Sequence, residues 1–421
     1  MKKTILVIGT YDTKNDELSF ISKKIVKLGG NILTMDVSVL GDPVDPTDIS
    51  KQTVAEAAGL TIDDAKNAGD ENKAMQIMAK GSSLLALQLY QKRKFDGVII
   101  LGGTMGTDLA LDVCMALPLG VPKYVVSTVS FSPLIPADRL APDIQMILWA
   151  GGLYGLNSIC EASLAQAAGA VLGAAKATMI RKEKIPCVGI TSLGTSALKY
   201  IKFLKPALEE RGYEVAIFHS TGMGGRAFES LCEQGAFVAV MDLCLQEFTN
   251  HIHGSEVSSG ENRLTAAGQN GIPQICAPGC HDLVDLICWQ EMPEKWKNHP
   301  YHAHNRLISS IVLKPSEREQ VAVGYMAQLA KASSETHLIL PRDGCGEWDR
   351  LEGGLRDQIG LDTFMVSCKD NCPNNVNLHE LNCHINDLEF VTKALEIFDD
   401  MVERQVVVRA INKVKDKNEF N

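Results

Sequence analysis

The sequence predicts an α/β protein of two Rossmann-like domains, each with a mostly parallel sheet flanked by helices. Three observations support this fold class. Short apolar, β-branched runs suited to buried strands recur along the chain, glycine-rich turns follow several of them, and helical periodicity resumes after those turns. With 421 residues and 45% hydrophobic content, the chain can bury two sizeable cores.

The composition excludes several classes of protein. The net charge of -10 argues against nucleic acid or an anionic membrane surface as the main partner. No apolar run approaches the roughly 20 residues that span a bilayer, so no membrane partner is expected. The apolar part of the N-terminus covers only Ile5 to Ile8, which suits a first strand better than a signal peptide. Twelve cysteines without CxxC pairs indicate reduced thiols and a cytoplasmic location.

The first predicted domain covers residues 1–180 and begins with a β-α-β unit. Its strands are expected at 4–9 and 31–37, with a helix at 19–28 between them. Further elements are predicted as helices at 49–58, 70–93 and 162–179 and a strand at 123–128. Parallel sheets bind ligands outside the carboxyl ends of their strands. We therefore expect the residues that follow the first two strands to share one edge: Thr10, Asp12, Thr13, Lys14, Asp36 and Ser38.

A glycine turn follows the next apolar strand, Val98 to Leu101, and precedes a helical pattern. Strand, glycine turn and helix start form an arrangement that binds phosphate, because backbone N–H groups at the helix N-terminus point at the anion. The spacing is neither a Walker A loop nor a complete G-x-G-x-x-G motif, so a plain strand-to-helix turn is an equal alternative. The candidate phosphate-binding residues are Gly102, Gly103, Thr104, Gly106 and Thr107.

Side-chain chemistry suggests roles at this edge. Lys14 can reach a phosphate, and Asp12 or Asp36 can hold a ribose hydroxyl or Mg²⁺. The alternative is that Asp12 and its neighbour only cap the next helix while Lys14 is solvated. Trp149 and Tyr154, which lie beside glycines, suit either an aromatic wall for a base or an interface or core.

A charge run at 181–184 marks the predicted domain boundary, and a second domain of residues 184–421 repeats the plan of the first. It again alternates strands, turns and helices. Its strands are predicted at 187–191, 214–218, 237–242, 272–277, 336–340 and 363–367, with a terminal helical region at 388–412.

A second glycine loop, HSTGMGGR at 219–226, follows the second strand of this domain. Arg226 can clamp a carboxylate or phosphate, and His219 can act as a general acid or base. Asp242 and Glu247, at and after the end of the next strand, complete the candidate catalytic residues. The alternative is a helix cap with an exposed arginine. The H-x-H pair at 251–253 supplies only two ligands, so no metal ligand is predicted.

Several motifs occur in a fixed order along the chain: GTYDTK, GGTMGT, HSTGMGGRAFE, and GIPQICAPG followed by YHAHN. This series resembles the Tm-one-like ATP-binding domain family, which is related to the N-terminal inhibitory domain of a tomato tobamovirus-resistance protein. The resemblance covers essentially the whole chain and implies two Rossmann-like halves, self-association and ATP bound in the first half. Plant members continue into a TIM-barrel region that this sequence lacks, so no activity of that region is carried over. The loops at 242–247 and 342–348 depart from the family pattern, which would change the substrate if these loops select it.

The leading hypothesis is an ATP-binding protein, with a kinase or ligase that acts on a small acidic or carbonyl metabolite as the candidate activity. ATP, with Mg²⁺, is expected on the first domain and the anion of the substrate on the second glycine loop. One alternative is a non-catalytic module that senses ATP and forms homo-oligomers. A weaker alternative is a metal-dependent hydrolase. The sequence does not decide whether the protein is an enzyme.

Overall fold

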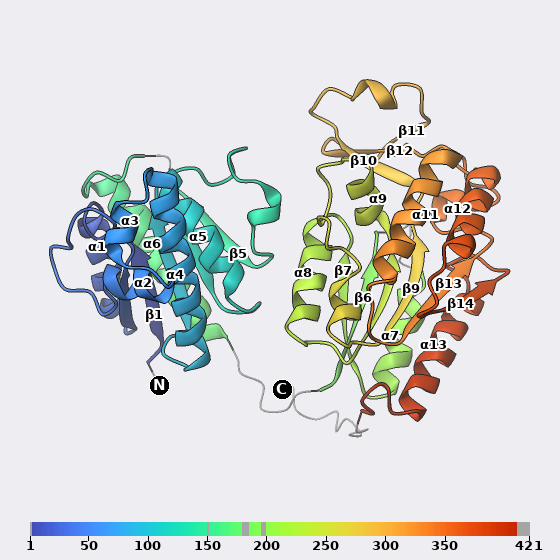
Figure 1. The fold of residues 1–421 in the computed structure, drawn as a ribbon, viewed down its shortest axis with the longest axis horizontal. Helices are drawn as coiled ribbons and strands as arrows, with labels where there is room; N and C mark the ends of the chain where they lie inside the picture. Colours follow the sequence, from blue (N-terminus) through green and yellow to red (C-terminus); the bar gives the residue numbers. More distant parts are fainter. Residues whose placement is uncertain (1, 150, 179–184, 195–198, 411–421) are drawn as a thin grey trace. The chain divides into compact units, whose positions relative to one another are not determined.

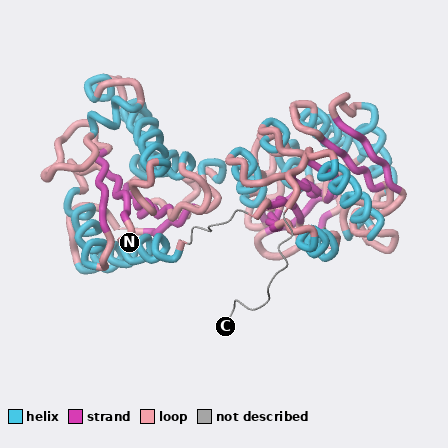
Figure 2. Tube along the Cα trace, turned by 90° about the horizontal axis from the view of Figure 1, so that it is seen from below, coloured by secondary structure: helices cyan, strands magenta, loops and turns pink. Residues whose placement is uncertain are grey.

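The computed structural model describes residues 2–149, 151–178, 185–194 and 199–410. The chain divides into two compact units, Met1–Lys182 and Glu183–Asn421 (Figure 1). Each unit is an α/β domain with its own parallel sheet and helices on both faces of that sheet (Figure 2). The predicted fold class of two Rossmann-like domains is therefore confirmed.

The first unit contains a five-stranded sheet in which every pair of neighbouring strands is parallel. β1 lies between β2 and β3. The connection that follows β1 leads to β2 at one edge of the sheet, and the connection that follows β3 leads to β4 in the opposite direction. Doubly wound sheets bind ligands in the crevice at such a reversal. The strands, in spatial order, are β2 (Asn31–Asp36), β1 (Thr4–Gly9), β3 (Gly97–Gly102), β4 (Lys123–Ser127) and β5 (Ile144–Leu148).

Alternating apolar side chains in the strands bury both faces of this sheet. In β1, Leu6 and Ile8 point into one core, while Ile5 and Val7 point into the other. Two helices cover the Ile5 face: α1 (Asn15–Lys27) and α6 (Ser158–Ala177). The Leu6 face is covered by α2 (Lys51–Ala57), α3 (Ile62–Lys66), α4 (Glu71–Gln91) and α5 (Thr104–Ala116).

Helix α6 is the single helix in the described part of the chain that is long and apolar enough to cross a membrane by length and composition. Its apolar face is buried in the core that it shares with α1 and the sheet, where Leu164, Ala168 and Val171 are fully buried. The apolar character of α6 is thus used for packing within the first unit.

The second unit has a six-stranded parallel sheet with the same reversal, here between β6 and β8. A separate sheet of three antiparallel strands accompanies it. The large sheet contains, in spatial order, β14 (Val376–Leu381), β13 (Thr336–Pro341), β9 (Gln274–Gly279), β8 (Ala239–Cys244), β6 (Cys187–Ser192) and β7 (Glu214–His219). The small sheet contains β10 (Leu283–Ile287), β12 (Ile308–Val312) and β11 (Tyr301–Ala303).

Helices again cover both faces of the large sheet. One core contains α7 (Ile201–Glu210) and α13 (Leu388–Glu403). The other side carries α8 (Met223–Glu233), α9 (Gln246–Ile252), α10 (Ala266–Gln269), α11 (Pro315–Leu329) and α12 (Gln358–Asp370). Short 3-10 turns occur at η1 (Ala137–Arg139), η2 (Glu294–Trp296) and η3 (Glu347–Asp349).

The predicted strand at 363–367 is wrong, because this segment lies inside α12. Leu361, Phe364 and Cys368 are buried at helical spacing, so tertiary packing selects a helix for a short apolar run that is also compatible with a strand. The last strand is instead β14, an edge strand in which apolar residues alternate with polar ones and most side chains are partly exposed.

Candidate functional site

The candidate site of the first unit lies at the carboxyl ends of β1 and β3. Ile8 of β1 is paired with Ile100 of β3, so the segments that follow the two strands leave the sheet side by side. The segment after β1 leads through residues 10–14 into α1, and the segment after β3 leads through Gly103 into α5. The structure therefore brings two of the predicted ligand segments together at the point where the strand order reverses.

Asp36 and Ser38 hold the segment after β1 by hydrogen bonds to its backbone. Asp36 Oδ1 accepts hydrogen bonds from the Tyr11 N–H at 3.2 Å and from the Ser38 hydroxyl at 2.5 Å. Ser38 Oγ in turn accepts from the Asp12 N–H at 3.2 Å. Both Asp36 and Ser38 are buried. In this arrangement they fix the backbone that carries Asp12 and Lys14.

Two carboxylate oxygens beside this loop are buried without a hydrogen-bond partner among the described residues: Asp12 Oδ1 and Asp36 Oδ2. The other oxygen of Asp12 accepts from the Gly41 N–H at 3.1 Å. Buried polar atoms are normally satisfied by protein, water or a ligand. In the described part of the chain, no group of three or more His, Cys, Asp or Glu side chains could hold a metal ion. Two carboxylates suit Mg²⁺ only when phosphate oxygens supply further ligands.

Lys14 and two threonines lie on the outer side of the same loop. The Lys14 ammonium lies 4.7 Å from the centre of the Tyr154 ring, and Tyr154 is 92% exposed. The hydroxyls of Thr10 and Thr13 lie 3.0 Å apart at the surface. The loop after β5 is tied to this edge, because the Gly155 N–H donates to the carboxylate of Glu17 in α1 at 2.9 Å.

The N-terminus of α5 is open at the other side of the crevice. Its N-cap is Gly103, which has no side chain to cap the helix, and the first turn of α5 contains no acidic residue. Apart from the adjoining residues, the nearest atom to a Cβ at Gly103 would be Thr128 Oγ1 at 3.9 Å, so there is free space in front of the helix N-terminus. Thr107 does not contribute there, because its buried hydroxyl donates to Gly103 O at 2.7 Å and lies 2.6 Å from Ser127 Oγ.

The second glycine loop is occupied by a carboxyl group of the protein itself. Glu247 Oε1 accepts hydrogen bonds from the Gly222 N–H at 2.6 Å and from the Gly225 N–H at 2.9 Å, at the N-terminus of α8. Glu247 is fully buried. The carboxylate thus occupies the backbone donors that the sequence suggested for a substrate.

Arg263 connects the acidic residues of this region. Its guanidinium binds Glu247 at 3.1 Å, Glu229 at 3.0 Å and both oxygens of Asp242. A further N–H donates to the Cys244 carbonyl at 3.2 Å, so all five N–H groups of Arg263 are used. Arg263 is fully buried. Asp242 and Glu247 therefore belong to a buried charge network in this structure.

His219 and Arg226 lie at the edge of the same loop. His219 is exposed, and its Nε2 accepts a hydrogen bond from the Gly194 N–H at 3.2 Å. That bond leaves the other ring nitrogen, 3.3 Å from Thr221 Oγ1, to carry the proton. The Arg226 guanidinium donates to Ser258 O at 3.1 Å. Of the predicted catalytic residues, His219 is thus exposed and Arg226 half-buried, while Asp242 and Glu247 are buried.

Sequence reasoning missed Arg263. The residue follows the polar segment SSGEN, where an arginine is normally solvated. The available signal was indirect: Glu229, Asp242 and Glu247 occupy positions next to buried apolar residues, and buried carboxylates require a partner.

The Glu247 carboxyl is expected to make the second unit less stable as the pH rises. Burial raises the pKa of Glu247 from its ordinary 4.5 to about 7, against the opposing effect of Arg263 and two backbone N–H groups. The folded state therefore keeps a proton that the unfolded state releases, and the resulting stability is complete below about pH 4.5 and lost by about pH 7. Urea denaturation at about pH 5 and about pH 7.5 measures this change. We expect a smaller change in Glu247→Gln, and an equal change in both proteins would contradict the assignment.

The fold and the two strand-order reversals define a two-domain Rossmann-like α/β protein. The chain belongs to the uncharacterised protein family UPF0261: the N-terminal domain of that family matches residues 3–179 and its C-terminal domain matches residues 185–402. The structure likewise divides the chain between Lys182 and Glu183.

The sequence identity between this chain and individual relatives varies widely. A UPF0261 protein of Brucella melitensis is 50% identical over 405 residues, which cover 96% of this chain and 97% of the relative. The ToMV resistance protein Tm-1 of Solanum lycopersicum is 27% identical over 423 residues, which cover 94% of this chain and 55% of that protein. Among solved structures, the UDP-GlcNAc 2-epimerase of Methanocaldococcus jannaschii aligns with 66% of this chain and 83% of its own, at 9% identity and a TM-score of 0.22. That TM-score is too low to support any argument about function.

Proposed function

We propose that the first unit binds ATP, together with Mg²⁺, in the crevice between the carboxyl ends of β1 and β3. The observation that carries the proposal is the uncapped N-terminus of α5 at Gly103, which lies at the strand-order reversal. Such a helix terminus presents free N–H groups and a partial positive charge to an anion. Doubly wound sheets place nucleotides at this position.

The surrounding side chains suit the phosphates of a nucleotide. Lys14 can turn from the Tyr154 ring towards a phosphate, since the contact between them is on the surface. The unpartnered oxygen of Asp12 suits Mg²⁺ once phosphate oxygens complete its coordination. The hydroxyls of Thr10, Thr13 and Thr104 add donors at the same edge. Asp36 and Ser38 act in this proposal by holding the loop rather than by touching the ligand.

The proposal is limited to nucleotide binding in the first unit. A kinase or ligase reaction would need a binding site for the substrate anion. The backbone N–H groups of Gly222 and Gly225, predicted for that role, already donate to Glu247. His219 remains the best candidate for contact with a substrate in the second unit, because it is exposed at the end of β7. A cytoplasmic location is proposed alongside, supported by twelve cysteines that are all free thiols.

A thermal-shift titration tests the proposal. ATP with Mg²⁺ at 100 times its dissociation constant should add about 2.7 kcal/mol of stability, which corresponds to about 5–10 °C for a unit of this size. Gly103→Val should abolish the shift, because its side chain enters the space in front of the α5 N-terminus. Gly173→Val is the matched control, since Gly173 lies in α6 with nothing within 4 Å of a built Cβ. The absence of a shift in the wild-type protein, or equal loss in both variants, would refute ATP binding at this site.

A second candidate function, ATP-responsive self-association, is supported by exposed apolar residues in the loops at the same edge. Leu40 after β2, Phe131 after β4 and Tyr154 after β5 are 79%, 77% and 92% exposed. Large apolar side chains that gather at one edge suit an interface. Sedimentation velocity with and without ATP tests this function: a change in mass that Phe131→Ser removes would support it, and an unchanged monomer would exclude it.

A further inference from the structure

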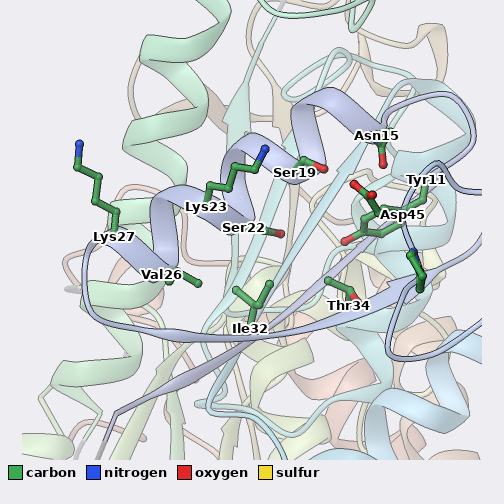
Figure 3. Close-up of a pocket in the computed structure, with 11 residues that line it drawn as sticks. Tyr11, Asn15, Ser19, Ser22, Lys23, Val26, Lys27, Ile32, Thr34 and Asp45 are labelled. Atoms are coloured by element: carbon green, nitrogen blue, oxygen red, sulfur yellow. The ribbon is translucent and has the colours of Figure 1, made fainter.

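A groove of about 430 Å³ lies between α1 and β2, the outermost strand of the first sheet (Figure 3). Its volume is within the range of small-molecule sites, which is about 300–1,000 Å³. The outer edge of β2 is bonded by the backbone of Ile49, which forms a parallel bridge with Met35. The groove is distinct from the N-terminus of α5, which lies on the opposite face of the sheet.

The lining of the groove is mostly apolar. Val26 of α1, which is 53% exposed, and Ile32 of β2 provide aliphatic surface, and the largely buried Tyr11 borders it. Apolar side chains exposed along a concave surface favour an apolar ligand, because the ligand removes them from water.

One polar atom in this lining is buried without a hydrogen-bond partner in the described structure, Asn15 Oδ1. Ser22 is only 7% exposed, and its hydroxyl interacts with Tyr11. Unsatisfied buried polar atoms are uncommon in folded proteins and call for a partner. Asn15 Oδ1 can only accept, so the matching group must be an N–H or O–H donor.

The charged residues of the groove are separated along its length. Figure 3 shows Asn15, Tyr11 and Asp45 together at one end and Lys27 with Val26 at the other, with Lys23 between them. A ligand with an acidic group therefore matches the lysine end, while a donor group matches the Asn15 end.

We propose that this groove binds a small amphipathic organic acid. Its apolar body packs on Val26 and Ile32, its anionic group faces Lys23 and Lys27, and a donor group meets Asn15 Oδ1. Tyr11 and Asn15, at the end of the connection from β1 and the start of α1, also line the groove. Binding of the acid in the groove does not depend on binding of ATP at the α5 N-terminus.

Two fluorescent probes test the proposal on the full chain. 8-Anilinonaphthalene-1-sulfonate has an apolar aromatic body, a sulfonate and an N–H donor, whereas N-phenyl-1-naphthylamine has the same body and donor without the charge. Lys23→Gln should weaken binding of the sulfonate about fivefold and leave the affinity for the neutral probe unchanged, since only the former loses an ion contact. Lys24→Gln, which removes the same charge from the next residue of α1 outside the groove, should change neither affinity.

A blocking variant and a variant at the proposed nucleotide site complete the test. Ser19→Phe fills the groove from α1 and should weaken both probes at least tenfold. Gly103→Val should leave both affinities unchanged, which separates this proposal from ATP binding. Equal effects of Lys23→Gln and Lys24→Gln would overturn the proposal. So would sulfonate binding that Ser19→Phe leaves intact. The comparison of the two lysine variants decides the question even if Ser19→Phe fails to fold.

Discussion

Arg263→Lys is expected to lower the free energy of unfolding of the second unit by about 3–5 kcal/mol. Arg263 is fully buried, and all five of its N–H groups donate to Asp242, Glu229, Glu247 and the Cys244 carbonyl. A lysine offers three donors at one point and cannot span three carboxylates, so buried anions would lose their partner. Urea denaturation followed by tryptophan fluorescence measures the change, because Trp289, Trp296 and Trp348 lie in this unit.

Arg211→Lys is the matched control for this prediction. Arg211 also makes two hydrogen bonds to a carboxylate, that of Asp399, but both side chains are partly exposed. Exposed ion pairs contribute at most about 1 kcal/mol, so this variant should remain close to the wild type. Similar losses in the two variants would show that burial of the Arg263 network does not determine its contribution.

Gly102→Ala is expected to destabilise the first unit by about 1–3 kcal/mol and to remove the thermal shift with ATP. A Cβ atom at Gly102 would lie 2.5 Å from Gly106 Cα and 2.9 Å from the Thr107 nitrogen. These are backbone atoms in the first turn of α5, so the helix would have to move away from the strand. Differential scanning calorimetry with and without ATP and Mg²⁺ measures both effects.

Gly103→Ala provides the comparison at the adjacent residue. Apart from the adjoining residues, a Cβ atom there would come no closer than 3.9 Å to another atom, so stability should change by about 0.5 kcal/mol or less. Gly102 is thus required for packing, while Gly103 leaves space for a ligand. If Gly103→Ala destabilised the unit as much as Gly102→Ala does, this distinction between the two glycines would be wrong.

The sequence predicts the architecture well because buried strands leave a strong local signal. The apolar runs at 4–9 and 98–101, each followed by a turn and helical periodicity, are strands of the observed sheet. The segment at 363–367 was assigned wrongly because five apolar or small residues fit both a strand and a buried helix face. Only its packing against other parts of the second unit decides between them.

The candidate sites were only partly predictable for a different reason. A glycine loop in the sequence predicts backbone N–H groups that could bind an anion. The local sequence does not show whether another part of the chain already accepts hydrogen bonds from them. Glu247 lies more than twenty residues after Gly222, and folding brings its carboxylate to that loop. The N-terminus of α5 has the same local pattern, yet its N-cap is Gly103, which has no side chain to cap the helix.

Each unit is built from one uninterrupted stretch of chain, residues 1–182 and 183–421. This contiguity has a consequence for synthesis on the ribosome. All five strands of the first sheet are translated before β6 begins, and domains generally fold as units while synthesis continues at about 5–20 residues per second. A nascent chain arrested late in its second half is therefore expected to carry a folded first unit, and ATP should protect that unit from a protease while translation is still incomplete.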